Sequence, residues 1–209
     1  MNKLFELDSP IWNFFSRLAD LVILNFCFIL CCIPIVTIGA AWTSLYYTVI
    51  KMKRGEGVAI TRTFFRSFKE NMKQATVMWM IDILLLALIA LDLVVVGALQ
   101  SGVRSVLHME ILVIGLVFLI IMMYSFPLLA QFENTIKNVY KNAFIMSLRH
   151  IGYTFLLAII TLAPVLLFLV NTSTITAILM IYLLIGFGLS AFINTGLYLR
   201  IFEYYMPKE

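Results

Sequence analysis

The sequence predicts an all-α integral membrane protein, a helical bundle with about six transmembrane helices in a single domain, residues 1–209. Two observations support this fold class. Of the 209 residues, 63% are hydrophobic and only 12% are charged, so there is too little polar surface to cover a water-soluble globule of this size. In addition, the stretch 21–50 contains no Asp, Glu, Lys or Arg, and it is longer than the roughly 20 apolar residues that one spanning helix needs.

The uncharged stretch must fold back within itself, and Pro34 is the natural turning point. Proline lacks a backbone N–H and biases the preceding residue away from helix, and Gly39 follows closely. We therefore predict a helical hairpin formed by helices near 10–32 and 37–52, with Pro34 and Gly39 in its hinge. Asn25, near the centre of the first helix, is expected to form an interhelical hydrogen bond rather than a ligand contact.

Two segments, 61–73 and 131–150, have the pattern of amphipathic interfacial helices. At 100° per residue, the basic side chains of the first segment fall within one narrow arc, apart from an aromatic arc that contains Phe64 and Phe68. This pattern favours the headgroup boundary of an anionic leaflet, although docking onto a partner or a polyanionic substrate would need the same face. The basic residues are Arg62, Arg66, Lys69 and Lys73.

Four further spans complete the predicted bundle. Pro127 lies inside the second of them and is a candidate second hinge. In the last span, Gly186 and Ser190 belong to a face of small residues, the kind of surface on which helices pack closely in lipid. The spans lie near residues 75–97, 111–129, 152–170 and 175–199.

Polar residues inside the spans are the candidate functional positions. Asp82 and Asp92 are ten residues apart in one predicted helix, on overlapping faces, and intramembrane carboxylates usually face the bundle interior or a watery cavity. Two interpretations stay open: the carboxylates line a pathway together with Asp20, or Asp82 pairs with an intramembrane donor such as Asn25 or Asn194 while Asp92 lies near the outer interface.

The distribution of basic residues orients the bundle. Residues 51–73 contain seven Lys or Arg and residues 131–150 contain three, against one in the segment 100–110. The positive-inside rule therefore places both basic segments and both termini in the cytoplasm, in a multi-pass cell-membrane protein. The alternative is five crossings, with the region around Pro34 re-entrant or kinked and the N-terminus outside.

The sequence contains none of the common catalytic or cofactor motifs. There is no phosphate-binding Walker loop, no nucleophile elbow and no His-Glu-x-x-His pair. Cys27, Cys31 and Cys32 all lie in the first apolar stretch, where cysteine behaves as a small hydrophobe. We expect no enzymatic activity, no cofactor, no metal site and no nucleic-acid partner.

Several sequence motifs resemble the YesL family of small polytopic membrane proteins from Gram-positive bacteria, and the similarity covers essentially the whole chain. These motifs are Leu7–Pro10, Leu18–Asn25, Cys32–Ala40, Phe65–Lys69 and Phe126–Thr135. The family is a domain of unknown function whose genes tend to lie in carbohydrate-utilisation clusters, near ATP-driven sugar importers. The resemblance implies an accessory role in sugar uptake, and it assigns no catalytic or ligand residues.

The resulting functional hypothesis is a non-enzymatic accessory subunit of a carbohydrate ABC importer, in contact with the bilayer and with the sugar permease or its ATPase. The chain lacks the cytoplasmic coupling loop with which sugar permeases contact their ATPase, which argues against its being the permease itself. Two alternatives are an independent small-solute transporter with Asp20, Asp82 and Asp92 in its polar core, and a factor that assembles glycopolymers of the cell envelope.

Overall fold

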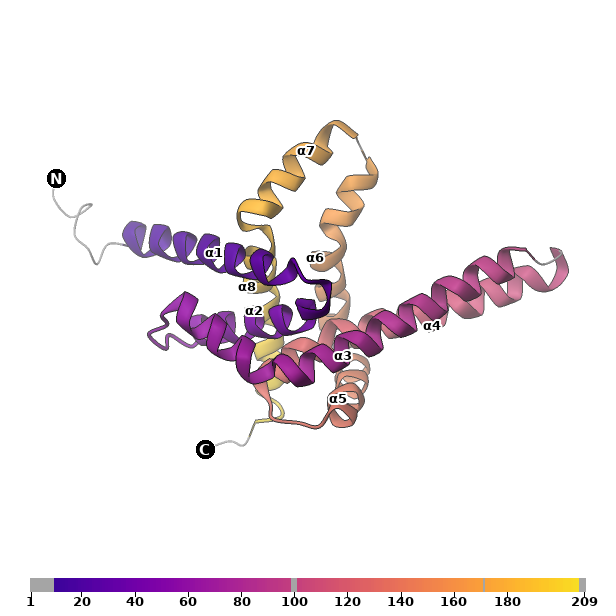
Figure 1. Cartoon of the computed structure of the whole chain (residues 1–209), viewed down its shortest axis with the longest axis horizontal. Coiled ribbons are helices and arrows are strands. Elements are labelled where there is room, and N and C mark those ends of the chain that lie inside the picture. The colour runs from indigo at the N-terminus through magenta and orange to yellow at the C-terminus, as the bar shows by residue number, and fades with distance from the viewer. Residues whose placement is uncertain (1–9, 99–100, 171, 207–209) are drawn as a thin grey trace.

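The computed structural model describes residues 10–98, 101–170 and 172–206, and all of its regular elements are helical (Figure 1). The predicted all-α architecture is therefore confirmed. In chain order the elements are α1 (Pro10–Cys32), the 3-10 turn η1 (Ile35–Thr37), α2 (Ile38–Lys53), α3 (Ile60–Gly97), α4 (Ser101–Gln131), α5 (Ile136–Arg149), α6 (Ile151–Val170), α7 (Thr172–Ile181), the π-helical segment η2 (Tyr182–Gly186) and α8 (Phe187–Phe202).

The chain turns back at Pro34, where the sequence places the hinge, and α1 and α2 lie side by side (Figure 1). The Thr37 hydroxyl donates to the carbonyl oxygens of Cys31 at 2.7 Å and of Pro34 at 2.8 Å. The indole N–H of Trp79, on α3, donates to the Ile35 carbonyl at 2.8 Å. Since a backbone group without a partner is costly in lipid, these bonds explain how a non-helical turn is stable at this position.

Within the described residues, four helical stretches are long and apolar enough to cross a membrane, and a fifth crossing results if the bent pair α5 and α6 counts as one. The expected number of six is not confirmed. The helix α2 has 16 residues, or about 24 Å, which is shorter than the roughly 30 Å of a hydrocarbon core. The four stretches are Phe14–Cys32, Ile60–Gly97, Val103–Gln131 and Ile175–Phe202.

One of the two predicted amphipathic segments contains a separate helix, and the other does not. The segment 61–73 is no separate helix but the first part of α3, which runs on to Gly97 because residues 58–96 contain neither glycine nor proline. The segment 131–150 does contain a separate amphipathic helix, α5, and the chain bends by 104° between α5 and α6. The segment 100–110, which the six predicted spans place in a loop between 75–97 and 111–129, is helical from Ser101 onward.

Pro127 lies inside α4 and does not end it, unlike Pro34. A proline at this position cannot donate to the carbonyl of Met123, four residues earlier. The hydroxyl of Tyr198, on α8, donates to that carbonyl at 2.8 Å. Pro127 therefore frees the Met123 carbonyl, to which α8 is bonded, and it does not form a second turn of the chain.

The core is centred on α2, which packs against α1, α3, α4 and α8. Gly39 lies in the first turn of α2 and not in the predicted hinge, and it permits a close approach to α3, because a β-carbon there would lie 2.5 Å from the Ala75 carbonyl oxygen and 2.7 Å from the Trp79 β-carbon. Away from this core, α3 and α4 continue together as an antiparallel pair that projects beyond the other helices (Figure 1).

Candidate functional site

Asp82 is the most deeply buried carboxylate among the described residues. It belongs to the face of α3 that also buries Ala75 and Met78. The hydroxyl of Tyr140, on α5, donates to Asp82 Oδ1 at 2.8 Å and lies 3.1 Å from the Met78 carbonyl oxygen. The second carboxylate oxygen, Oδ2, is buried and has no hydrogen-bond partner among the described residues. The pair can hold α5 against α3, and it also leaves one carboxylate oxygen free to bind a proton.

Sequence reasoning did not identify Tyr140 as the partner of Asp82, and the suggested donors Asn25 and Asn194 have other partners. A signal for Tyr140 was nevertheless present. It lies next to Val139 on the buried side of α5, and a tyrosine on such a face brings a hydroxyl that needs a hydrogen-bond partner.

Asn25 connects α1 to the π-helical segment before α8. Its Nδ2 group donates to the carbonyl oxygens of Tyr182 at 3.1 Å and Leu183 at 2.8 Å, and its Oδ1 accepts from the Gly188 N–H at 3.0 Å. The wider π-helical turn breaks the regular hydrogen-bond ladder, and the Asn25 amide supplies replacement partners. This agrees with the expected interhelical hydrogen bond.

The other candidate polar residues do not form a common site. Asn194 is buried and donates to the Thr161 hydroxyl at 3.1 Å, which links α8 to α6. Asp20 is partly buried and lines a small cavity with Arg17 and Glu56, where α1 approaches the loop between α2 and α3. Asp92 is exposed. The structure therefore does not bring Asp20, Asp82 and Asp92 into one polar core.

The basic face of α3 is exposed as the sequence indicates, whereas Phe64 and Phe68 of the aromatic arc are turned toward the bundle and Phe65 is 37% exposed. The four basic side chains point outward, and Arg66 forms an ion pair with Glu70 at 2.9 Å. Phe64 is fully buried and stacks on Phe68, which packs against the core. These two rings therefore attach the start of α3 to the bundle and do not insert into lipid. The exposed basic residues are Arg62, Arg66, Lys69 and Lys73.

Gly186 and Ser190 face a side chain of their own chain. A β-carbon at Gly186 would lie 2.5 Å from the Tyr182 ring, and the Tyr182 hydroxyl lies 3.2 Å from Ser190 Oγ. The small residues thus make room for Tyr182 beside the π-helical turn. Gly186 is therefore buried by its own chain, while Ser190 stays partly exposed.

The described part of the chain shows neither a cluster of metal ligands nor a paired cysteine. Those residues include no group of three or more His, Cys, Asp or Glu side chains placed to hold a metal ion. Cys27, Cys31 and Cys32 are free thiols.

Comparison with known protein families gives a match over part of the chain. Residues 21–93 match the DUF624 family, a protein family of unknown function. YesL-like proteins are members of DUF624, so the match supports the resemblance seen in the sequence. The DUF624 segment covers about a third of the 209 residues, and it includes the hinge at Pro34, the close approach at Gly39 and the buried Asp82. No curated protein and no solved structure matches the chain significantly.

Proposed function

We propose that the chain is a non-enzymatic membrane subunit that assembles with a carbohydrate ABC importer, with both termini in the cytoplasm. The resemblance to YesL-like proteins supports the link to sugar uptake, by association rather than by mechanism. The fold favours an assembly role over a transport pathway, since its buried polar side chains bond to groups of the chain itself, either within one helix or between helices.

The observation that carries the proposal is the projecting part of α3 and α4, residues 84–97 and 103–116, which we call the arm (Figure 1). Its apolar side chains are uncovered on several sides, with Leu84 60% and Val94 72% exposed. Asp92 is also exposed on the arm. A carboxylate on an apolar helix is costly in lipid unless it reaches the interface or finds a partner, and a permease helix with a basic or hydroxyl side chain would provide one.

A second candidate, an independent small-solute transporter, has one observation in its favour. The buried Oδ2 atom of Asp82 lacks a hydrogen-bond partner among the described residues, as a proton-binding or ion-binding carboxylate would before loading. The bond from Tyr140 to the other oxygen favours the assembly role, because it ties the carboxylate to a neighbouring helix. Asp82→Asn separates the two functions: a transporter loses uptake with assembly intact, whereas a subunit retains both.

The experiment is affinity capture of the tagged protein from native membranes in a mild detergent, followed by mass spectrometry. Near-stoichiometric recovery of a sugar permease pair or its ATPase is expected. Recovery should fall when Asp92→Asn is combined with Val94→Trp on the arm, and it should persist in the control Leu156→Trp, an exposed position on α6. Recovery of the chain alone or as a homo-oligomer would contradict the proposal.

A further inference from the structure

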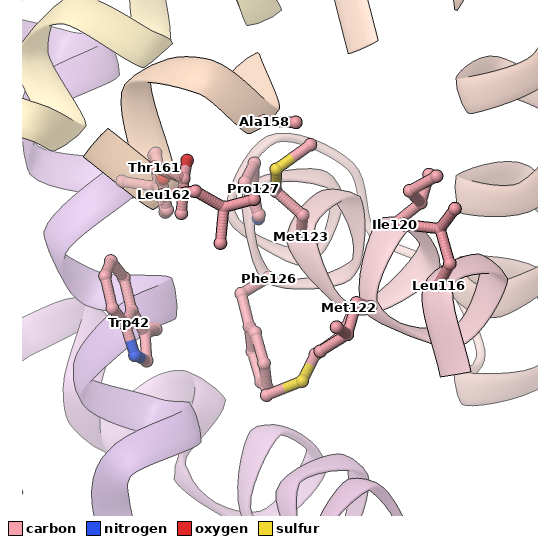
Figure 2. Close-up of a pocket in the computed structure, with 12 residues that line it drawn as sticks. Trp42, Leu116, Ile120, Met122, Met123, Phe126, Pro127, Ala158, Thr161 and Leu162 are labelled. Atoms are coloured by element: carbon pink, nitrogen blue, oxygen red, sulfur yellow. The ribbon is translucent and has the colours of Figure 1, made fainter. Parts of the chain in front are cut away.

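A crevice between α2, α4 and α6 lies apart from the Asp82 pair and meets the arm only at Leu116 (Figure 2). Its volume is about 240 Å³. Figure 2 shows Trp42 of α2 on one side, Phe126 and Met122 of α4 on the other, and Leu162 of α6 nearby. The crevice is thus built from residues that are distant in the sequence.

The crevice exists because α4 and α6 diverge. The two helices meet at Tyr124 and Thr154, whose hydroxyl oxygens are 2.8 Å apart. From this contact they separate toward Leu116 and Leu162, both of which line the crevice. The small side chain of Ala158, on the wall formed by α6, leaves the space between them open.

The walls are almost entirely apolar. The lining residues include no charged side chain, and their polar side-chain groups are the hydroxyls of Tyr46 and Thr161 and the indole N–H of Trp42. The Thr161 oxygen already accepts a hydrogen bond from Asn194. A buried water needs two to four polar partners, and a sugar with its several hydroxyl groups needs more than these walls provide. An empty space of this kind would lose the dispersion contacts that its lining atoms could make.

The mouth of the crevice faces the hydrocarbon region. Leu116 and Leu162 are 58% and 47% exposed, and Leu116 belongs to one of the candidate membrane spans, Val103–Gln131. One turn of a partner helix, about 10 Å wide with its side chains and about 5.4 Å long, occupies roughly 400 Å³, which is more than the crevice volume of about 240 Å³. We propose that an acyl chain of a membrane lipid enters this crevice and packs between α2, α4 and α6.

The test uses Trp42 as a fluorescent reporter of the crevice. The chain has three tryptophans, so Trp12→Phe and Trp79→Phe leave Trp42 alone. This protein is reconstituted into phosphatidylcholine vesicles with or without bromine on the acyl chains, since bromine quenches indole emission on contact. Circular dichroism and gel filtration verify that each variant is folded. We expect strong quenching of Trp42 by the brominated chains.

Blocking and control variants separate the crevice from the general lipid surface. Ala158→Phe, or the smaller Ala158→Ile if the first does not fold, should remove most of the quenching because the added side chain fills the space. Val113→Phe adds the same ring at an exposed position of α4 outside the crevice, and it should leave the quenching unchanged. Unquenched Trp42, or equal quenching in folded Ala158 variants, would overturn the proposal.

Discussion

Gly39→Ala is the most informative single substitution in the hinge region. The added β-carbon would lie 2.5 Å from the Ala75 carbonyl oxygen, 2.7 Å from the Trp79 β-carbon and 3.0 Å from Cε1 of Phe126. The Ala75 oxygen is a backbone atom of α3, and the Trp79 β-carbon is bonded directly to that backbone. Neither atom can move without shifting the whole helix. The substitution must therefore push α2 and α3 apart.

The expected cost follows from two opposing effects. Overpacking a close contact typically costs about 1–3 kcal/mol, and replacing glycine by alanine within a helix returns roughly 0.5–1 kcal/mol. A shift of α3 would also lengthen the 2.8 Å hydrogen bond from Trp79 to the Ile35 carbonyl, so we expect net destabilisation of about 1–2 kcal/mol.

The assay is unfolding of the purified protein in mixed detergent micelles with increasing sodium dodecyl sulfate, followed by circular dichroism. Gly115→Ala is the matched control, because the nearest atom to its added β-carbon is Ile89 Cγ2 at an ordinary 3.7 Å. We expect the control to be neutral or slightly stabilised and Gly39→Ala to unfold at clearly lower detergent. Equal midpoints for the two variants would refute the close approach of α2 and α3.

Three further predictions use the same unfolding assay. Tyr140→Phe leaves Asp82 without its donor and should cost about 1–3 kcal/mol, while Tyr204→Phe, at an exposed site, should be silent; equal effects would argue against the Asp82 pair. Asn25→Leu removes three hydrogen bonds and should cost about 1–3 kcal/mol, whereas Asn138→Leu, also exposed, should have little effect. Tyr198→Phe should cost about 0.5–1.5 kcal/mol in the native chain. The cost should be smaller in a Pro127→Ala background, because alanine restores an N–H for the Met123 carbonyl. Strictly additive effects of the two substitutions would contradict the link between α8 and α4.

Features that depend on local chemistry could be predicted from the sequence. The turn at Pro34 follows from the length of the uncharged stretch and from the missing N–H of proline. The interhelical role of Asn25 follows from the cost of an unpaired amide in lipid. The amphipathic helix α5 follows from its repeating pattern of polar and apolar residues.

Features that depend on which helices meet could not be predicted in this way. The partner of Asp82 is Tyr140, 58 residues away, and no local pattern indicates that α5 packs beside this part of α3. The same reason explains Phe64, whose face could have met lipid as well as protein, and Gly186, whose space is taken by Tyr182. The continuity of α3 through residues 61–73 was visible only as a lack of glycine and proline, because amphipathicity alone does not show where a helix ends.

The most direct test of the assembly role is site-specific photocrosslinking in living cells. A photoreactive amino acid replaces Val94 on the arm, and in a matched strain it replaces Ile159, an exposed position on α6. The proposed function predicts an adduct with the permease of a carbohydrate importer from position 94 and none from position 159. Lipid adducts alone at both positions, in cells that express the importer, would contradict the proposal that the arm contacts it.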